Sequence, residues 1–227
     1  MSTSSPLSLE ASLAARSDVW RGVHGARPPT EASGIASLDT RLPGGGWPLG
    51  ALSELLLEAS GIGELQLALP LLVRLTQAGR HVAFVAAPQL PYAPALARAG
   101  LVLTRTLVVD PQTSDEAANE AIGAAEQLLR TPAYGAVLAW MPNLREADAR
   151  RLQLAAESSG NIGLIYRPAR VAGSANIAAL RLKLARRETR LEIEILKVRG
   201  GRSGARFFAD EPAPLRAVIS VDRRDAA

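Results

Sequence analysis

The sequence contains no cysteine and only two histidines, His24 and His81. The lack of cysteine excludes a disulfide framework, thiol catalysis, and any zinc or iron–sulfur site with cysteine ligands. Two isolated histidines cannot form a histidine cluster around a metal ion. We therefore expect no metal site in this protein.

Long apolar runs and targeting signals are also missing. The stretch Leu65–Val73 is interrupted by Gln66 and Pro70 and is far shorter than a membrane span. The first ten residues lack a basic stretch followed by an apolar one, so we expect no secretory signal. The sequence predicts a soluble, cytoplasmic protein with no membrane contact.

Lysine is nearly absent, since the 26 basic residues include only Lys183 and Lys197. The formal net charge of the chain is only +4, but it is unevenly distributed. Residues 145–206 hold 14 basic and 6 acidic residues, a net charge of +8, whereas residues 1–144 hold 9 and 12, a net charge of −3. The basic character is therefore a property of one stretch.

The 227 residues are enough for one domain with a substantial core, with short appendages at its ends. A helical pattern over residues 6–22 predicts an N-terminal arm, 1–24, which carries Trp20 as a candidate partner contact. Pro, Gly and Ser then mark a linker, 25–34. We expect the main domain over residues 35–210 and a flexible tail over residues 211–227.

Short apolar runs alternate with helical segments through most of the main domain. The expected strands are 52–57, 81–86, 106–109, 136–140 and 162–166, and the expected helices are 65–78, 93–99, 114–130 and 146–158. This alternation predicts an α/β fold, a parallel sheet with helices on both faces. Three further strand-like segments, 179–185, 189–198 and 205–208, predict an antiparallel extension at one edge of the sheet.

The segment after the first strand lies where a phosphate-binding loop would lie. A working loop needs G-x-x-x-x-G-K-[ST], in which backbone amides hold the phosphates, Lys reaches them, and the hydroxyl binds Mg²⁺. Here Gly63 matches and Gly61 suits a tight turn, but Glu58 replaces the first Gly, Glu64 the Lys and Leu65 the Ser or Thr. A carboxylate in place of the ammonium reverses an attraction of about 4 kcal/mol at about 4 Å. We expect a degenerate phosphate loop or a plain strand–helix turn, and no nucleotide hydrolysis.

The segment before this strand, Ser37-Leu-Asp-Thr-Arg-Leu-Pro-Gly-Gly-Gly-Trp-Pro-Leu-Gly50, resembles the one that precedes the Walker A loop in RecA recombinases. The arrangement looks most like the RecA-like ImuA family. Members of that family accompany an inactive Y-family polymerase homologue and an error-prone replicative polymerase in damage-induced mutagenesis. The SulA-type cell-division inhibitors are a neighbouring family. The resemblance runs from about Gly34 to Phe208 and implies a RecA-like fold.

When the recombinase motifs are placed on this sequence position by position, their catalytic and nucleotide-binding residues are missing. The catalytic glutamate would lie near Pro88, the Walker B aspartate at Trp140, and the polar nucleotide sensor at Arg167. The long DNA-binding loop of recombinases shrinks to about residues 168–176. These departures imply a pseudo-ATPase without a cofactor. Trp140 could fill the space that a nucleotide leaves, or contact a partner.

The basic stretch offers further candidate contacts. Arg181 and Lys183 alternate with leucines, which predicts that both charges share one strand face. Together with Trp20, the candidate contacts for a partner or DNA are Arg181, Lys183, Arg186, Arg187, Lys197, Arg199, Arg202 and Arg206. Three interpretations stay open: DNA phosphate binding, an arginine-rich protein interface, and a solvated face paired with Glu192 and Glu194. Aromatic residues for base stacking are few nearby.

The resemblance implies a non-catalytic adaptor in the SOS-type DNA damage response and in error-prone translesion synthesis. Its implied partners are the inactive polymerase homologue and, as further candidates, RecA and the error-prone polymerase. The alternatives are a basic DNA-binding or RecA-modulating protein and a SulA-like cell-division inhibitor. The oligomeric state stays open.

Overall fold

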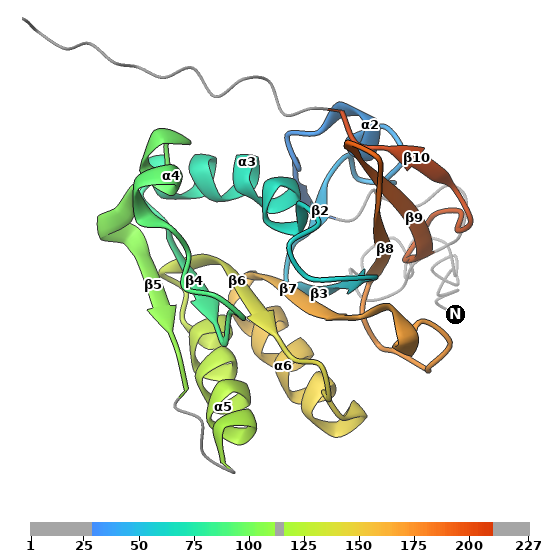
Figure 1. Ribbon diagram of the computed structural model, residues 1–227. Coiled ribbons are helices and arrows are strands. Elements are labelled where there is room, and N and C mark those ends of the chain that lie inside the picture. The colour runs from blue at the N-terminus through green and yellow to red at the C-terminus, as the bar shows by residue number, and fades with distance from the viewer. Residues whose placement is uncertain (1–28, 112–115, 211–227) are drawn as a thin grey trace, which may run out of the picture.

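The computed structural model describes residues 29–111 and 116–210 (Figure 1). The helical segments are α2 (Ala36–Asp39), α3 (Glu64–Gln77), α4 (Ala93–Arg98), α5 (Ala117–Arg130) and α6 (Glu146–Ser159), with 3₁₀ turns η1 (Leu103–Arg105) and η2 (Ala169–Val171). The strands are β1 (Thr30–Glu31), β2 (Trp47–Pro48), β3 (Ala51–Leu57), β4 (His81–Val85), β5 (Thr106–Val109), β6 (Tyr134–Trp140), β7 (Ile162–Pro168), β8 (Leu180–Arg187), β9 (Arg190–Val198) and β10 (Arg206–Phe208). No helix in these ranges is long and apolar enough to span a membrane.

Eight strands form one sheet in the order β10-β9-β8-β3-β7-β6-β4-β5. The strands from β8 to β5 run parallel to one another, whereas β9 pairs antiparallel with β8, and β10 pairs antiparallel with β9. Helices α5 and α6 lie against one face of the sheet and α3 against the other (Figure 1). The predicted α/β fold with an antiparallel C-terminal extension is confirmed.

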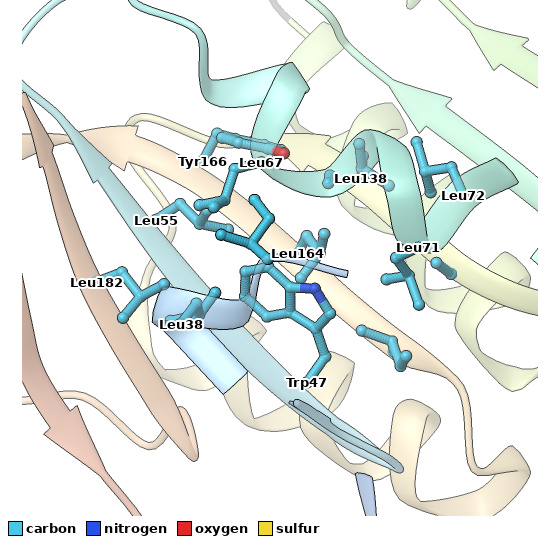
Figure 2. Packing of buried hydrophobic residues seen from close by; sticks show 14 of the residues in the cluster. Leu38, Trp47, Leu55, Leu67, Leu71, Leu72, Leu138, Leu164, Tyr166 and Leu182 are labelled. Carbon is cyan, nitrogen blue, oxygen red and sulfur yellow. The ribbon is translucent and has the colours of Figure 1, made fainter. Parts of the chain in front are cut away.

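One core fills the space between the sheet and α3. Trp47 is fully buried there and lies among leucines such as Leu38, Leu71 and Leu164 (Figure 2). This tryptophan comes from the glycine-rich segment on which the resemblance rests, and Gly46 before it has no room for a side chain. A Cβ on Gly46 would lie 2.1 Å from the Glu31 carbonyl oxygen. The segment is therefore a packing motif that holds β2 against β1.

Two boundaries differ from the predicted ones. Within residues 30–34, predicted as the end of the linker, β1 pairs with β2 and Ser33 is buried. The helix predicted over 114–130 is observed from Ala117, and Glu116 takes its N-cap position. The predicted arm 1–24 with Trp20, the first residues of the linker and the tail 211–227 lie outside the described residues.

Candidate functional site

The loop between β3 and α3 has the backbone geometry of a tight, glycine-dependent turn. Gly61 and Gly63 have φ values of 76° and 102°, in the left-handed region that side chains other than glycine rarely adopt. Gly63 is the N-cap of α3, so the first amides of the helix point into the loop. In this position a helix N-terminus commonly binds an anion.

The anion at this helix N-terminus is the chain's own Glu64. Its Oε1 accepts a hydrogen bond from the Gly61 amide, with an N···O distance of 3.0 Å, and its Oε2 accepts one from the Gly63 amide at 3.1 Å. The Glu64 residue is buried, with 7% of its surface exposed. From the sequence, Glu64 was expected only to repel a phosphate. In the structure its carboxylate also occupies amides that a phosphate would use.

Aromatic rings fill the space beside this loop at the ends of β6 and β7. Trp140 and Tyr166 are partners in the β6–β7 register and stack with centroids 4.4 Å apart and an interplanar angle of 13°. Tyr166 is 1% exposed, and its hydroxyl has no hydrogen-bond partner among the described residues. Burial, and to a smaller degree the charge of Glu64, raises the pKa of the Tyr166 phenol. Tyr166 was not among the candidate site residues, although it ends the strand expected over residues 162–166; in the structure that strand, β7, continues to Pro168.

The other two positions, Leu65 and Pro88, carry apolar side chains. Leu65 is partly buried and packs against the core, as its place on the inner face of α3 requires. Pro88 is exposed beyond the end of β4, just after Ala86 with its φ of 51°. Within the ranges that the structure describes, no group of three or more carboxylates and histidines could hold a metal ion.

Glu58 lies at the end of β3 but turns toward β8. Its carboxylate pairs with Lys183 Nζ at 3.0 Å and with Arg187 Nη1 at 2.9 Å. The hydrogen bond from Arg187, followed by the one from Lys183, lowers the pKa of Glu58. These two cations, proposed as contacts for a partner or DNA, therefore already neutralise an acidic residue of the protein.

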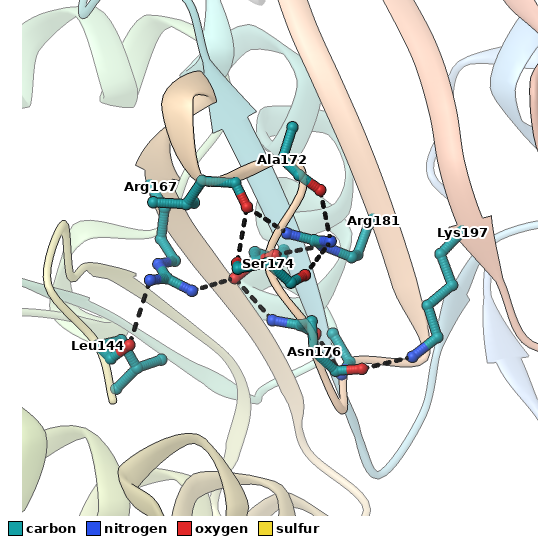
Figure 3. A network of polar contacts seen from close by, with 10 residues as sticks. Leu144, Arg167, Ala172, Ser174, Asn176, Arg181 and Lys197 are labelled. Carbon is teal, nitrogen blue, oxygen red and sulfur yellow. Dashed lines mark hydrogen bonds and ion pairs between the residues drawn. The ribbon is translucent and has the colours of Figure 1, made fainter. Parts of the chain in front are cut away.

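Arg181 was predicted to lie on an exposed basic face, and this prediction is wrong. The residue is 5% exposed, and its Nε donates to Glu54 Oε2 at 2.5 Å (Figure 3). Its remaining guanidinium nitrogens donate to the carbonyls of Val171, at the end of η2, and of Ala172 and Ser174 in the loop after it. The physical reason is that Glu54 lies opposite Arg181 in the β3–β8 register and this loop covers both.

Glu54 is the centre of a buried polar network that the sequence analysis missed. Besides Arg181, it binds Arg167 Nη1 at 2.7 Å and Asn176 Nδ2 at 2.8 Å (Figure 3). The available signal was a lone carboxylate in the middle of an apolar strand, because a buried charge needs a partner. Arg167, aligned with a nucleotide sensor, instead joins Glu54 to the segment after β6, because its Nη2 donates to the Leu144 carbonyl at 3.2 Å.

The other basic candidates fall into two groups. Arg206 pairs with Glu194 at 2.9 Å, and Lys197 Nζ donates to the Asn176 carbonyl at 2.7 Å. Burial, then the charges of Arg199 and Arg181, lowers the pKa of Lys197. Arg186, Arg199 and Arg202 are exposed and form no ion pair within residues 29–111 and 116–210.

The parallel sheet, the glycine loop before α3 and the antiparallel C-terminal strands define a protein of the RecA-like class. The crystal structure of the RadB recombinase superimposes with a TM-score of 0.61 at 17% sequence identity, and the match covers 78% of this chain and 94% of RadB. At this level of identity the similarity concerns the fold.

The family follows from the sequence comparisons. The family model described as cell division inhibitor SulA matches residues 50–163, half of the chain, and the chain belongs to this family. Cell division inhibitor SulA of Serratia marcescens is 32% identical over 53% of this chain and 70% of its own length. Protein ImuA of Caulobacter vibrioides is 29% identical over 89% of this chain and 95% of its own length. The chain is thus homologous to both SulA and ImuA, and the match to ImuA extends over much more of it.

Proposed function

We propose that this protein is a non-catalytic, RecA-like accessory protein of the bacterial DNA damage response. In this role it acts as an adaptor that links the proteins of error-prone translesion synthesis in the cytoplasm. The partners are the inactive Y-family polymerase homologue and, beyond it, RecA and the error-prone replicative polymerase. The match to ImuA over 89% of the chain supports this assignment.

The single observation that carries the non-catalytic part is the position of the Glu64 carboxylate. It bonds to the Gly61 and Gly63 amides, so a nucleotide phosphate would have to displace a buried, doubly hydrogen-bonded anion. The stacked Trp140 and Tyr166 side chains beside it offer no carboxylate, the protein ligand that Mg²⁺ prefers at a nucleotide site. This arrangement supports a degenerate phosphate loop and a pseudo-ATPase.

Two measurements test the proposal. Titration with a fluorescent ATP analogue and Mg²⁺, with a RecA recombinase as the positive control, should detect no binding in the micromolar range. Co-purification of the full chain from damaged cells should recover the polymerase homologue. Micromolar nucleotide affinity would overturn the pseudo-ATPase assignment, and damaged cells that yield no polymerase homologue would overturn the adaptor role.

Cell-division inhibition is a second candidate because the family model is described by that activity. The model ends at residue 163, before β8, β9 and β10, whereas the alignment with ImuA takes in most of the chain. The antiparallel extension therefore favours the adaptor role. Expression of the protein in undamaged cells separates the two, since an inhibitor of division would produce filaments and an adaptor would not.

Direct DNA binding is a third candidate, favoured by the exposed Arg199 and Arg202 on the connection from β9 to β10. Phosphate contacts of this kind weaken steeply as salt concentration rises. Affinity for single-stranded DNA, measured at about 50 and 200 mM salt, should then fall sharply and should drop further in Arg199→Glu/Arg202→Glu. An unchanged affinity in this variant would remove these two arginines from the interface.

A further inference from the structure

A wide groove with a volume of about 660 Å³ lies between α3, α4 and the turn that joins β8 to β9. Its apolar lining includes Leu69 and Pro70 of α3, Ala95 of α4, Ala99 just after that helix, and Leu191 of β9. The groove begins close to the degenerate phosphate loop, because Arg186 Nη1 lies 3.4 Å from the position of a Cβ on Gly63. Its size falls in the range of sites that bind ligands or peptide side chains.

Three arginines line this groove: Arg98 at the end of α4, Arg186 at the end of β8 and Arg190 at the start of β9. None of them forms an ion pair with any residue in the part of the chain that the structure describes. The neighbouring Arg187 differs, because it is paired with Glu58 and Glu192.

Among residues 29–111 and 116–210, the few contacts of these three arginines leave their charge uncompensated. Arg186 Nη1 donates to the Ile62 carbonyl at 3.4 Å, and the Arg190 guanidinium lies 4.4 Å from the centroid of the Phe208 ring. The one carboxylate in the lining, Asp210, accepts a hydrogen bond from the Ser37 amide at 2.7 Å. The groove thus combines an apolar floor with an excess of two positive charges.

We propose that this groove binds an acidic amphipathic helix of a partner protein. Apolar side chains at i and i+4 of such a helix would enter the floor, and flanking Glu or Asp would pair with the three arginines. The inference rests on the proposed adaptor function only in requiring a protein partner. It identifies that partner by the chemistry of its docking segment.

The other occupants fit less well. A DNA backbone would use the arginines but not the apolar floor, and the neighbouring aromatic ring, Phe208, is already covered by Arg190. The chain's own residues 211–227 hold three acidic and three basic residues and so carry no net charge to complement the groove. An acidic, partly apolar helix matches both features of the groove.

The test is a selection of 16-residue peptides from a random display library against the full-length protein, followed by anisotropy titration of the labelled peptides. The first variant is Arg98→Glu/Arg186→Glu/Arg190→Glu, and its control is Arg199→Glu/Arg202→Glu, which reverses exposed charges outside the groove lining. The second is Ala95→Trp, which fills the groove from an exposed position, with Ala97→Trp on the same helix as its control.

We expect the selected peptides to be rich in Glu and Asp, with apolar residues spaced by three or four. Their affinity should fall roughly tenfold or more in the triple charge reversal and in Ala95→Trp, and stay within about twofold in both controls. Peptides without acidic enrichment, or with the same affinity for all variants, would overturn the proposal.

Two additional probes distinguish the other occupants. Tighter binding of a labelled peptide of residues 211–227 than of the selected peptides would assign the groove to the chain's own tail. If the binding of single-stranded DNA depends on the same three arginines, and the binding of the peptides does not, the groove is a nucleic-acid surface. Either result overturns the proposal, whereas co-purification of the polymerase homologue by the triple variant would leave the adaptor role standing without this groove.

Discussion

Replacement of Glu64 by alanine removes the carboxylate that bonds to both glycine amides of the loop before α3. Hydrogen bonds to a charged group contribute about 1.5–3 kcal/mol each, and a negative charge in the first turn of a helix adds about 0.3–1 kcal/mol. Water can reach part of the loop in the variant, because Gly61 is exposed, so the full sum is not lost. We expect Glu64→Ala to lower the free energy of unfolding by about 1–3 kcal/mol.

The same variant should create an anion site that the wild-type protein lacks. With its carboxylate gone, the loop presents backbone amides at a helix N-terminus, which favour phosphate or sulfate. If inorganic phosphate binds with a dissociation constant of about 2 mM, about 20 mM phosphate would restore about 1.4 kcal/mol. The wild-type protein should gain no such stability, since Glu64 occupies the amides.

Thermal unfolding followed by circular dichroism measures both effects. For a chain of this size, the destabilisation corresponds to a decrease in Tm of about 2–12 °C. Chloride at matched ionic strength controls for general salt effects, and Glu120→Ala controls for the loss of an exposed glutamate in the first turn of a helix, α5. A Glu64→Ala protein as stable as the wild type, or equal phosphate stabilisation of both proteins, would refute the role assigned to the Glu64 carboxylate.

Three further predictions concern stability. Glu54→Gln leaves Arg181 buried without a counter-charge and should cost about 3–5 kcal/mol in urea unfolding; a loss below about 1 kcal/mol would contradict the buried network. Because Arg187 lowers the folded-state pKa of Glu58, stability from this pair is present above the ordinary value of 4.5 and is lost as pH falls through the lowered pKa. The decline of wild-type stability in acid should therefore be steeper than that of Glu58→Gln, and identical pH profiles would argue against it. Leu71→Ala removes a fully buried side chain under the sheet and should cost about 2–5 kcal/mol, whereas a loss under about 1 kcal/mol would place Leu71 outside the core.

Most of the fold could be predicted because its signals are local. Apolar runs of strand length, such as that of β3, are bounded by glycines and polar turns, and these appear within a few residues of each other along the chain. The parallel arrangement follows from the alternation of strands and helices alone. Helix boundaries were less accurate, as with α5, because capping depends on a few residues at the end of the helix.

For the candidate site, the sequence predicted only which residues replace those of a recombinase, and not how the replacements are arranged. The resemblance to recombinases places Glu64 and Trp140 where a phosphate loop and a magnesium site would need other residues, and this expectation needs only the sequence. That the Glu64 carboxylate folds back onto two amides depends on the side-chain conformation and the loop backbone. That Trp140 stacks on Tyr166 depends on the pairing of β6 with β7, which are separated along the chain by α6.

The uneven charge of the chain shows the same difference between what the sequence and what the tertiary structure determine. The sequence by itself determined that cations concentrate in residues 145–206, because composition is a property of the chain. The tertiary structure alone decided which cations are available to a partner. Strand pairing buries Arg181 against Glu54, more than a hundred residues away, and leaves Arg186 exposed beside an apolar groove. Pairing of charges requires contact in space, and contacts between distant strands arise only when the whole sheet is assembled.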